Sequence, residues 1–308
     1  SWDEAVKAGA VDIMQTKYPG LEIIVDPSGG LTKLIAEKDD PVADVSFIDD
    51  SAMPRAIALG IAQPLDFSKI PSAADVYEKG KLFGDYGLAM EFGRLGLAYR
   101  TDKLSEAPTS WADMWNPEYA GHVSIGTAEA GSTAWVQFLI AAAELGGGGV
   151  DNIDPGFEKL TELKPNLLTV TNSTAQVTQL LTDGDLWLTH FWDGRTIQAA
   201  RDGIPVAFVA PEEGAFATIT YVSMISGSKH PDLAHELIDL MLSTAGQRAF
   251  GEEIGYGPTN KEVVLPEEMI AEGVLYGSDE VDAMRILDWE ALSLKEAEWL
   301  ERWNDAVL

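Results

Sequence analysis

Short apolar runs alternate along the chain with segments whose apolar residues recur every three to four positions, the pattern of buried strands and amphipathic helices. In residues 2–17 this spacing places Val6, Ala10, Ile13 and Met14 on one helix face. The strands that the pattern predicts cover 21–25, 43–50, 86–100, 121–128, 167–172 and 218–226. The helices that it predicts cover 2–17, 31–40, 51–61, 132–147, 154–165, 173–185, a pair in 230–255 and most of 272–308.

This order of elements, without an internal repeat, predicts an α/β fold with open, parallel-rich sheets. A chain of 308 residues exceeds the usual size of one hydrophobic core, so we expect two lobes. Gly93 interrupts the long apolar run of residues 86–100, and glycine tolerates the twist that a crossing between lobes requires. Trp289, Trp299 and Trp303 are expected to anchor the C-terminal helices.

Charge and composition narrow the class of protein. With 50 acidic and 21 basic residues the formal charge is −29, a field that repels nucleic acid and anionic lipid. It is typical of a highly soluble surface and also suits attraction of a cationic ligand. No cysteine is present, which excludes disulfides and thiolate chemistry, and no apolar run is long enough to span a membrane. No signal peptide precedes Ser1, so an exported protein would be represented here in processed or truncated form.

Residues 186–224 are the most informative stretch, because they predict a strand, an aromatic and charged turn, a helix, a strand, a loop and a strand. The first strand ends in Phe191, Trp192, Asp193, Gly194 and Arg195. Open α/β sheets bind ligands beyond the carboxyl ends of their strands, so this turn is a candidate binding site.

Catalytic motifs are not found in the sequence. His122, His190, His230 and His235 are scattered, and no second histidine follows His235-Glu236 as in a zinc-protease helix. The sequence has no nucleophile elbow, no P-loop and no dinucleotide fingerprint after a strand. The glycines of 146–149 follow a helix and indicate a C-terminal cap. We therefore expect no enzyme, no cofactor and no metal site.

Several segments occur in an order and spacing that resembles the periplasmic solute-binding proteins of ABC importers, in the subgroup that binds spermidine, putrescine, iron and small organic ions. The segments are SGGLTKLIAEKDDPVADVSF, PTSWADMWNPEYAGHVSI, GDLWLTHFWDGR, RDGIPVAFVAPEEG and EEIGYGPTN. These matches are distributed along nearly the whole chain. Family members begin with a strand and a glycine turn before the first helix, whereas this chain begins in the helix at Ser1-Trp2, so it is either truncated or lacks that strand.

The resemblance implies a type II periplasmic binding fold with a ligand cleft between two lobes that close on the solute. Lobe 1 would hold residues 1–97 and 220–262, and lobe 2 would hold 98–219 and 263–308, with hinge strands near 90–98 and 216–224. The protein would be a periplasmic monomer that captures a small charged organic solute and passes it to the ABC permease, without nucleic acid as a partner. An enzyme on a similar fold, porphobilinogen deaminase, requires a reactive cysteine that this chain lacks.

Candidate ligand contacts in the second lobe centre on the turn after Phe191. The resemblance implies that the Trp192 indole packs against the aliphatic or cationic part of the ligand, and the alternative is packing within the lobe. Asp193 and Arg195 either pair with each other or bind the two ends of a zwitterion, Asp193 an ammonium and Arg195 a carboxylate. Ser132 and Thr133 open an apolar helix and either cap it or bind an anionic or hydroxylated group.

Candidate contacts in the first lobe come from a strand end, a glycine turn and the crossing strand. Asp49 and Asp50 end a strand, so one can cap the next helix while the other binds an amine. Ser28 and Gly29 lie in a turn that can hold an anion. The resemblance gives Phe92 the place of an aromatic in the cleft, and a core position is the alternative.

Thr220 and Tyr221 stand where the polyamine binders are expected to carry carboxylates. Carboxylates are also missing at the turn of residues 131–134, so the sequence favours a monoamine or an amino acid-like zwitterion, such as a γ-amino acid, over a polyamine. The alternatives are an anionic solute, a sugar phosphate or phosphonate, and ferric iron, although the adjacent tyrosine pair of ferric binders is not visible.

Overall fold

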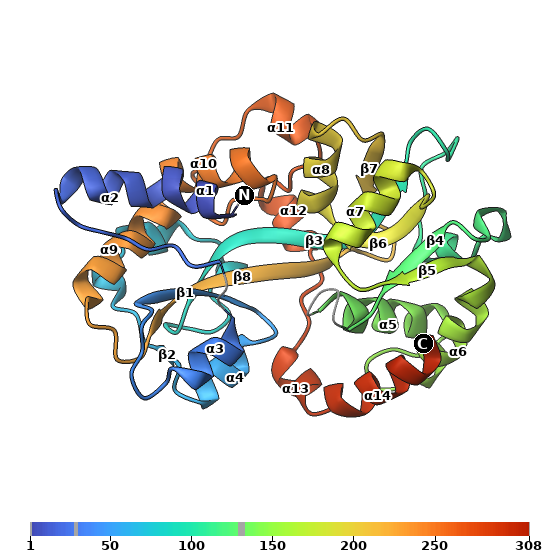
Figure 1. Ribbon diagram of the computed structural model, residues 1–308, viewed down its shortest axis with the longest axis horizontal. Helices are drawn as coiled ribbons and strands as arrows, with labels where there is room; N and C mark the ends of the chain where they lie inside the picture. Colours follow the sequence, from blue (N-terminus) through green and yellow to red (C-terminus); the bar gives the residue numbers. More distant parts are fainter. Residues whose placement is uncertain (1, 28–29, 129–132, 308) are drawn as a thin grey trace. The chain divides into compact units, whose positions relative to one another are not determined.

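The computed structural model describes residues 2–27, 30–128 and 133–307, and it has a mixed α/β architecture (Figure 1). The chain divides into two compact units, Ser1–Gly93 with Thr218–Ala283, and Arg94–Ala217 with Met284–Leu308. Two of the boundaries fall inside strands, β3 (Leu88–Arg100) and β8 (Phe216–Ile225), which are the two strands expected to cross.

Residues 263–283, which we expected in the second lobe, lie in the first unit. Packing explains their place, because a Cβ built on Gly257 would lie 2.5 Å from the carbonyl oxygen of Leu275. The Lys79 ammonium also donates a hydrogen bond to the carbonyl of Asp282 over 2.7 Å. These contacts hold residues 263–283 against the rest of the first unit.

In the first unit, β8 pairs antiparallel with β1 (Val45–Asp49) and β2 (Ala62–Gln63). In Figure 1, α9 and α10 lie on one side of β1 and β8, and α3 and α4 lie on the other. The other elements of this unit are α1 (Trp2–Val6), η1 (Lys7–Val11), α2 (Asp12–Lys17), α3 (Leu31–Ala36), α4 (Met53–Ala58), η2 (Phe67–Lys69), η3 (Pro71–Asp75), η4 (Glu78–Gly80), α9 (Pro231–Leu242), α10 (Thr244–Ile254), α11 (Glu267–Ala271) and α12 (Ser278–Ala283).

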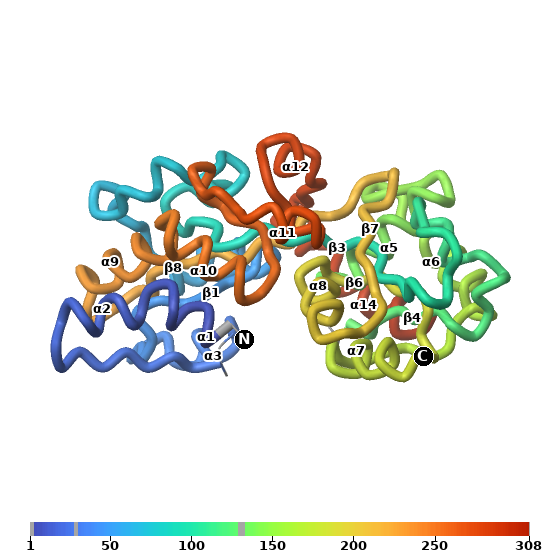
Figure 2. The backbone as a smooth tube through the Cα atoms, turned by 90° about the horizontal axis from the view of Figure 1, so that it is seen from above, coloured from blue at the N-terminus to red at the C-terminus, as the bar shows by residue number. Residues whose placement is uncertain are grey.

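The N-terminal helix contains a π-helical turn, η1, between α1 and α2. The wider turn rotates the following residues about the helix axis, so Val6, Ala10 and Met14 are buried while Ile13 is 42% exposed. The expectation for Ile13 was therefore wrong. Gly9 allows close contact with α10, since a Cβ there would lie 3.2 Å from the carbonyl oxygen of Gly246; Figure 2 shows α10 beside this helix.

The strand expected at residues 21–25 is not present, because the described residues 21–26 form no regular element. Ile24, in the middle of this apolar run, is 81% exposed. β-Propensity alone does not make a strand, which also needs a neighbour for its backbone hydrogen bonds. The second predicted strand does form, as β1, and pairs with β8.

In the second unit, β4 (Val123–Gly126) pairs parallel with β5 (Leu167–Thr171) and β6 (Leu188–Trp192). The second half of β3 pairs antiparallel with β6 and with β7 (Val206–Val209). The helices of this unit are η5 (Trp111–Trp115), η6 (Pro117–Tyr119), α5 (Ala134–Leu145), α6 (Asp154–Leu163), η7 (Lys164–Asn166), α7 (Thr174–Asp183), α8 (Asp193–Arg201), α13 (Trp289–Ser293) and α14 (Glu296–Val307). Residues 186–224 have the predicted order of strands and helix, but the predicted turn is absent, because α8 starts directly after β6 and contains Asp193, Gly194 and Arg195.

Helices cover both faces of the part of the sheet that lies in the second unit. Figure 1 shows α5, α6 and α14 on one face and α7 and α8 on the other, and a separate hydrophobic cluster fills each side. Trp289, Trp299 and Trp303 are buried in the larger cluster, as predicted. None of the helices in the described ranges combines the length and apolarity that a membrane crossing needs.

Gly93 does not interrupt its strand, since β3 runs through it without a break. The glycine is required for another reason: a Cβ there would lie 2.7 Å from Oγ1 of Thr218 and 2.9 Å from the ring of Tyr256. Contacts between carbon and side-chain atoms this short do not occur in proteins without displacement. Close packing, not twist, therefore explains the glycine.

Candidate functional site

A small pocket opens in the second unit at the carboxyl ends of the parallel strands β4, β5 and β6. The helices that follow these strands, α5 and α7, begin at its wall. The lining residues are Gly126, Thr127, Ala134, Trp135, Thr171, Thr174, Val177, His190, Phe191 and Trp192. The position agrees with the rule that open α/β sheets bind ligands beyond the carboxyl ends of their strands.

Trp192 ends β6 and lines this pocket. Its ring is partly buried and packs against both hydrophobic clusters of the unit, with its centroid 5.5 Å from that of Phe191. Trp192 therefore packs within the unit, which is one of the two alternatives, and it also lines a pocket.

His190, one strand position from Phe191, is buried with 5% exposure. Its Nε2 accepts a hydrogen bond from the backbone N–H of Gly126 over 3.2 Å, and its ring stacks on Phe138 with centroids 4.8 Å apart. Removal from water disfavours the charged imidazolium and lowers the pKa of His190 to about 3. The ring at the pocket is therefore neutral at physiological pH. A histidine within an apolar strand was a signal for this role that the sequence prediction did not use.

Asp193 is buried, with 1% exposure, and pairs with Arg94 of β3, not with Arg195. Its Oδ2 lies 2.9 Å from Nε of Arg94, and its Oδ1 accepts hydrogen bonds from the backbone N–H groups of Arg94 and Gly194. Burial raises the pKa of the Asp193 carboxyl, and the positive charge of Arg94 opposes that rise. Of the two alternatives for this turn, pairing of Asp193 with Arg195 is therefore not the one that the structure shows, since Arg94, 99 residues away, pairs with the carboxylate.

Arg94 was not a candidate in the sequence. Its guanidinium lies 5.3 Å from the centroid of Phe208, and its pair with Asp193 fixes the first turn of α8, directly after Trp192. A charged residue in an otherwise apolar strand was the available signal. Arg195, in the same first turn of α8, is exposed.

A second polar group lies in the first unit, around Thr220 of β8. The Thr220 hydroxyl donates to Oδ1 of Asp49 and its backbone N–H donates to Oε1 of Glu91, each over 3.1 Å. Asp49 is exposed, whereas Glu91 is 3% exposed. Asp49 and Thr220 are direct cross-strand partners. The carboxylates of Asp49 and Glu91 therefore lie on either side of Thr220, which itself has no carboxylate.

Three other candidates of the first unit lie in its interior. Phe92 is fully buried next to Tyr77, with ring centroids 6.1 Å apart. Tyr221 is fully buried against Phe83, and burial raises the pKa of its hydroxyl above the usual range. Asp50 is 3% exposed, and its Oδ1 accepts from the N–H of Ser51. For Phe92 the core alternative describes the position.

The candidate N-cap residues of α4 and α5 do not cap these helices with their side chains. Ala52 occupies the N-cap of α4 and makes no side-chain capping bond, so neither Asp49 nor Asp50 caps that helix. Thr133 is buried at the N-cap of α5, and its side chain does not cap the helix. Ser28, Gly29 and Ser132 lie outside the described residues.

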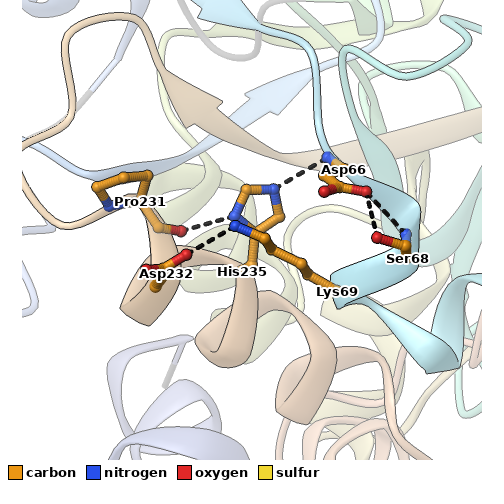
Figure 3. A network of polar contacts seen from close by, with 6 residues as sticks. All are labelled: Asp66, Ser68, Lys69, Pro231, Asp232 and His235. Carbon is orange, nitrogen blue, oxygen red and sulfur yellow. Dashed lines mark hydrogen bonds and ion pairs between the residues drawn. The ribbon is translucent and has the colours of Figure 1, made fainter.

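His235, which lies outside the pocket, makes contacts that stabilise the first unit. Figure 3 shows His235 of α9 between the carbonyl of Pro231, which lies 2.6 Å from Nδ1, and the backbone N–H of Asp66, which donates to Nε2 over 2.9 Å. In the same view Lys69 pairs with Asp232. In the described part of the chain no group of three or more His, Cys, Asp or Glu residues could hold a metal ion.

Residues 9–275 match the model of a family described as bacterial extracellular solute-binding proteins. The chain belongs to this family. Among similar proteins, the spermidine/putrescine-binding periplasmic protein 1 of Haemophilus influenzae is 26% identical over 100% of the chain and 84% of its own length. The gamma-aminobutyric acid-binding protein of Pseudomonas aeruginosa is 26% identical over 80% of the chain and 70% of its own length.

The fold is also that of solved relatives. A crystal structure of an ABC transporter protein from Clostridium perfringens is 25% identical, with a TM-score of 0.82 over 99% of this chain and 97% of that one. The solute-binding protein thus has the two-lobed type II periplasmic binding fold, and its relatives are substrate-binding components of ABC importers.

Proposed function

We propose that this solute-binding protein captures a small organic amine or amino acid-like zwitterion in the periplasm and delivers it to an ABC permease. The observation that carries the proposal is the indole of Trp192 at an open pocket beyond the carboxyl ends of three parallel strands. An indole face attracts an ammonium group by about 0.5–2 kcal/mol and also packs against a short alkyl chain. The relatives named for polyamines and for gamma-aminobutyric acid support this ligand class.

The residues favour a zwitterion over a diamine. None of the described residues that line the pocket is an Asp or Glu, so an ammonium group would find no carboxylate there. Asp49, exposed in the first unit and bonded to Thr220, is the proposed partner of the single ammonium. Arg195, exposed in the first turn of α8, is a proposed partner of a carboxylate.

An anionic solute is the second candidate. Two helices, α5 and α7, contribute their first residues to the pocket wall, and helix N-termini favour negative charge. A phosphorylated or phosphonate compound would use those termini without any amine contact.

A thermal-shift panel of diamines, ω-amino acids, α-amino acids, sugar phosphates and phosphonates tests the proposal. We expect stabilisation by at least one amine or amino acid, and its loss in Trp192→Ala with retention in the matched packing control Trp187→Ala. No stabilisation by any amine, together with a clear shift from a phosphorylated compound, would establish the anionic alternative. Small-angle scattering with and without the active ligand tests closure, and its molecular mass tests the expected monomer.

A further inference from the structure

Two polar side-chain atoms in the pocket of the second unit are buried without a hydrogen-bond partner among the described residues. They are Nδ1 of His190 and Oγ1 of Thr127, and both residues line the pocket. A buried polar atom without a partner is destabilising, so native proteins rarely retain one unless something else satisfies it. Two such atoms at one pocket indicate a ligand with complementary groups.

The tautomer of His190 fixes what that complementary group must be. The N–H of Gly126 donates to Nε2, so Nε2 carries no proton and the neutral ring carries its proton on Nδ1. A protonated ring would place two N–H groups against each other at Gly126. His190 therefore offers a hydrogen-bond donor, and the Thr127 hydroxyl can donate as well.

The rest of the wall agrees with an acceptor-rich, negatively charged group. The described lining residues include a hydroxyl at Thr174 but no Asp, Glu, Lys or Arg. The Thr171 hydroxyl already donates to the carbonyl of Ile125 over 3.2 Å. The twelve-residue helix α5 and the ten-residue helix α7 begin at the wall with Ala134 and Thr174, and their N-terminal ends carry partial positive charge. The Thr133 side chain makes no capping bond to α5.

We propose that this pocket binds the carboxylate end of the solute, with Nδ1–H of neutral His190 and the Thr127 hydroxyl as its donors. The inference rests on the proposed function and names the ligand class within it, an amino acid with a free carboxylate beside Trp192. It also assigns the carboxylate to the pocket instead of to Arg195, which is exposed in α8 and does not line it.

Isothermal titration calorimetry with matched compounds tests the assignment. γ-Aminobutyrate and putrescine each have four carbons and one terminal amine, and they differ in the second end group, a carboxylate or a second amine. 5-Aminovalerate and cadaverine repeat this comparison with five carbons. We expect the wild-type protein to bind the amino acid of at least one pair more than about 10-fold tighter than its diamine, which is the effect of a charge-assisted hydrogen bond. Butyrate and butylamine, added separately, report each end alone.

Two variants remove the donors singly. Thr127→Val keeps the shape of the side chain, and His190→Phe keeps a ring to stack on Phe138. Each should weaken binding of the amino acid by about 10-fold or more and leave diamine binding within about 2-fold. The matched controls are Thr182→Val, exposed near the end of α7, and His122→Phe, whose ring stacks on Trp187 outside the pocket. Arg195→Gln tests the competing partner of the carboxylate.

A readout that does not depend on affinity is the ¹⁵N shift of the His190 ring. Without ligand, Nε2 should show the shift of an unprotonated nitrogen, and the amino acid should move the Nδ1 resonance while butylamine does not. Binding of diamines but not amino acids, or loss of amino acid binding in Arg195→Gln with no loss in Thr127→Val and His190→Phe, would overturn this assignment and leave the amine receptor intact. Binding of no amine at all would overturn the proposed function itself.

Discussion

The backbone N–H of Gly126 donates a hydrogen bond to Nε2 of His190 over 3.2 Å, across the parallel strands β4 and β6. This bond can form only while the ring nitrogen is unprotonated. Burial acts in the same direction, since it lowers the pKa of His190 from its usual 6.5 to about 3. The protonation of one side chain is therefore linked to the stability of the second unit.

We predict that His190 makes the protein less stable in mild acid. Between pH 6.5 and 3 the unfolded chain takes up a proton at this position that the folded chain does not. The contribution is complete above pH 6.5 and falls by about 1.4 kcal/mol per pH unit as the pH decreases towards 3. Urea unfolding from pH 7 to 5 measures the slope, and His190→Phe should reduce it relative to the wild type. An equal reduction in His122→Phe would show that the slope does not come from His190.

The pair of Arg94 and Asp193 should contribute much more to stability than an exposed pair. In Arg94→Met the Asp193 carboxylate is left buried without its charge partner, so we expect the free energy of unfolding to fall by about 3–5 kcal/mol. Lys69→Met, which removes the exposed pair with Asp232 seen in Figure 3, should cost far less, because solvent screens that pair. Chemical denaturation measures both. Equal costs would mean that burial does not distinguish the two pairs.

Gly93→Ala should destabilise the protein by about 1–3 kcal/mol through overpacking. The new methyl group would meet Oγ1 of Thr218 and the ring of Tyr256 closer than normal contact distance. Addition of Thr218→Ala should restore part of the loss, because it removes one of the two contacts. Thermal unfolding of the single and double variants checks this, and an unchanged midpoint in Gly93→Ala would favour the original expectation that twist explains the glycine.

We predict that Thr220→Asp lowers the stability of the protein at pH 7 and strengthens its binding of diamines. The new carboxylate would stand beside Asp49 and Glu91, so we expect the variant to be less stable at pH 7 than at pH 4.5 relative to the wild type. It should also bind putrescine several-fold tighter, since a second ammonium gains a partner. Thr220→Val, which loses only the bond to Asp49, should cost about 0.5–1.5 kcal/mol at both pH values. Unfolding and calorimetry at the two pH values separate these effects.

Local pattern was enough for most elements of the chain. The periodicity predicted the helices α5, α6 and α7 and the order of elements through residues 186–224, because amphipathic spacing depends only on neighbours along the chain. It failed at residues 21–25, where a strand also needs a partner, and at Ile13, where a π-helical turn rotated the face.

The candidate site was predicted less completely. Trp192 at the end of β6 followed from the sequence, since strand ends in α/β folds are local features. Arg94 as the partner of Asp193 did not, because the two residues are 99 positions apart. The burial of Phe92 and Tyr221 was equally invisible, since a local pattern does not distinguish a cleft aromatic from a core aromatic.

The sequence by itself determined the α/β class, the family resemblance and the absence of cysteine chemistry, all of which are set by residue type and spacing. Only the tertiary structure decided that His190 is a buried neutral donor, that Asp193 is committed to Arg94 and that Asp49 and Glu91 flank Thr220. The physical reason is that burial and hydrogen-bond geometry arise from contacts between strands distant along the chain, and these contacts set the charge and direction of each polar group.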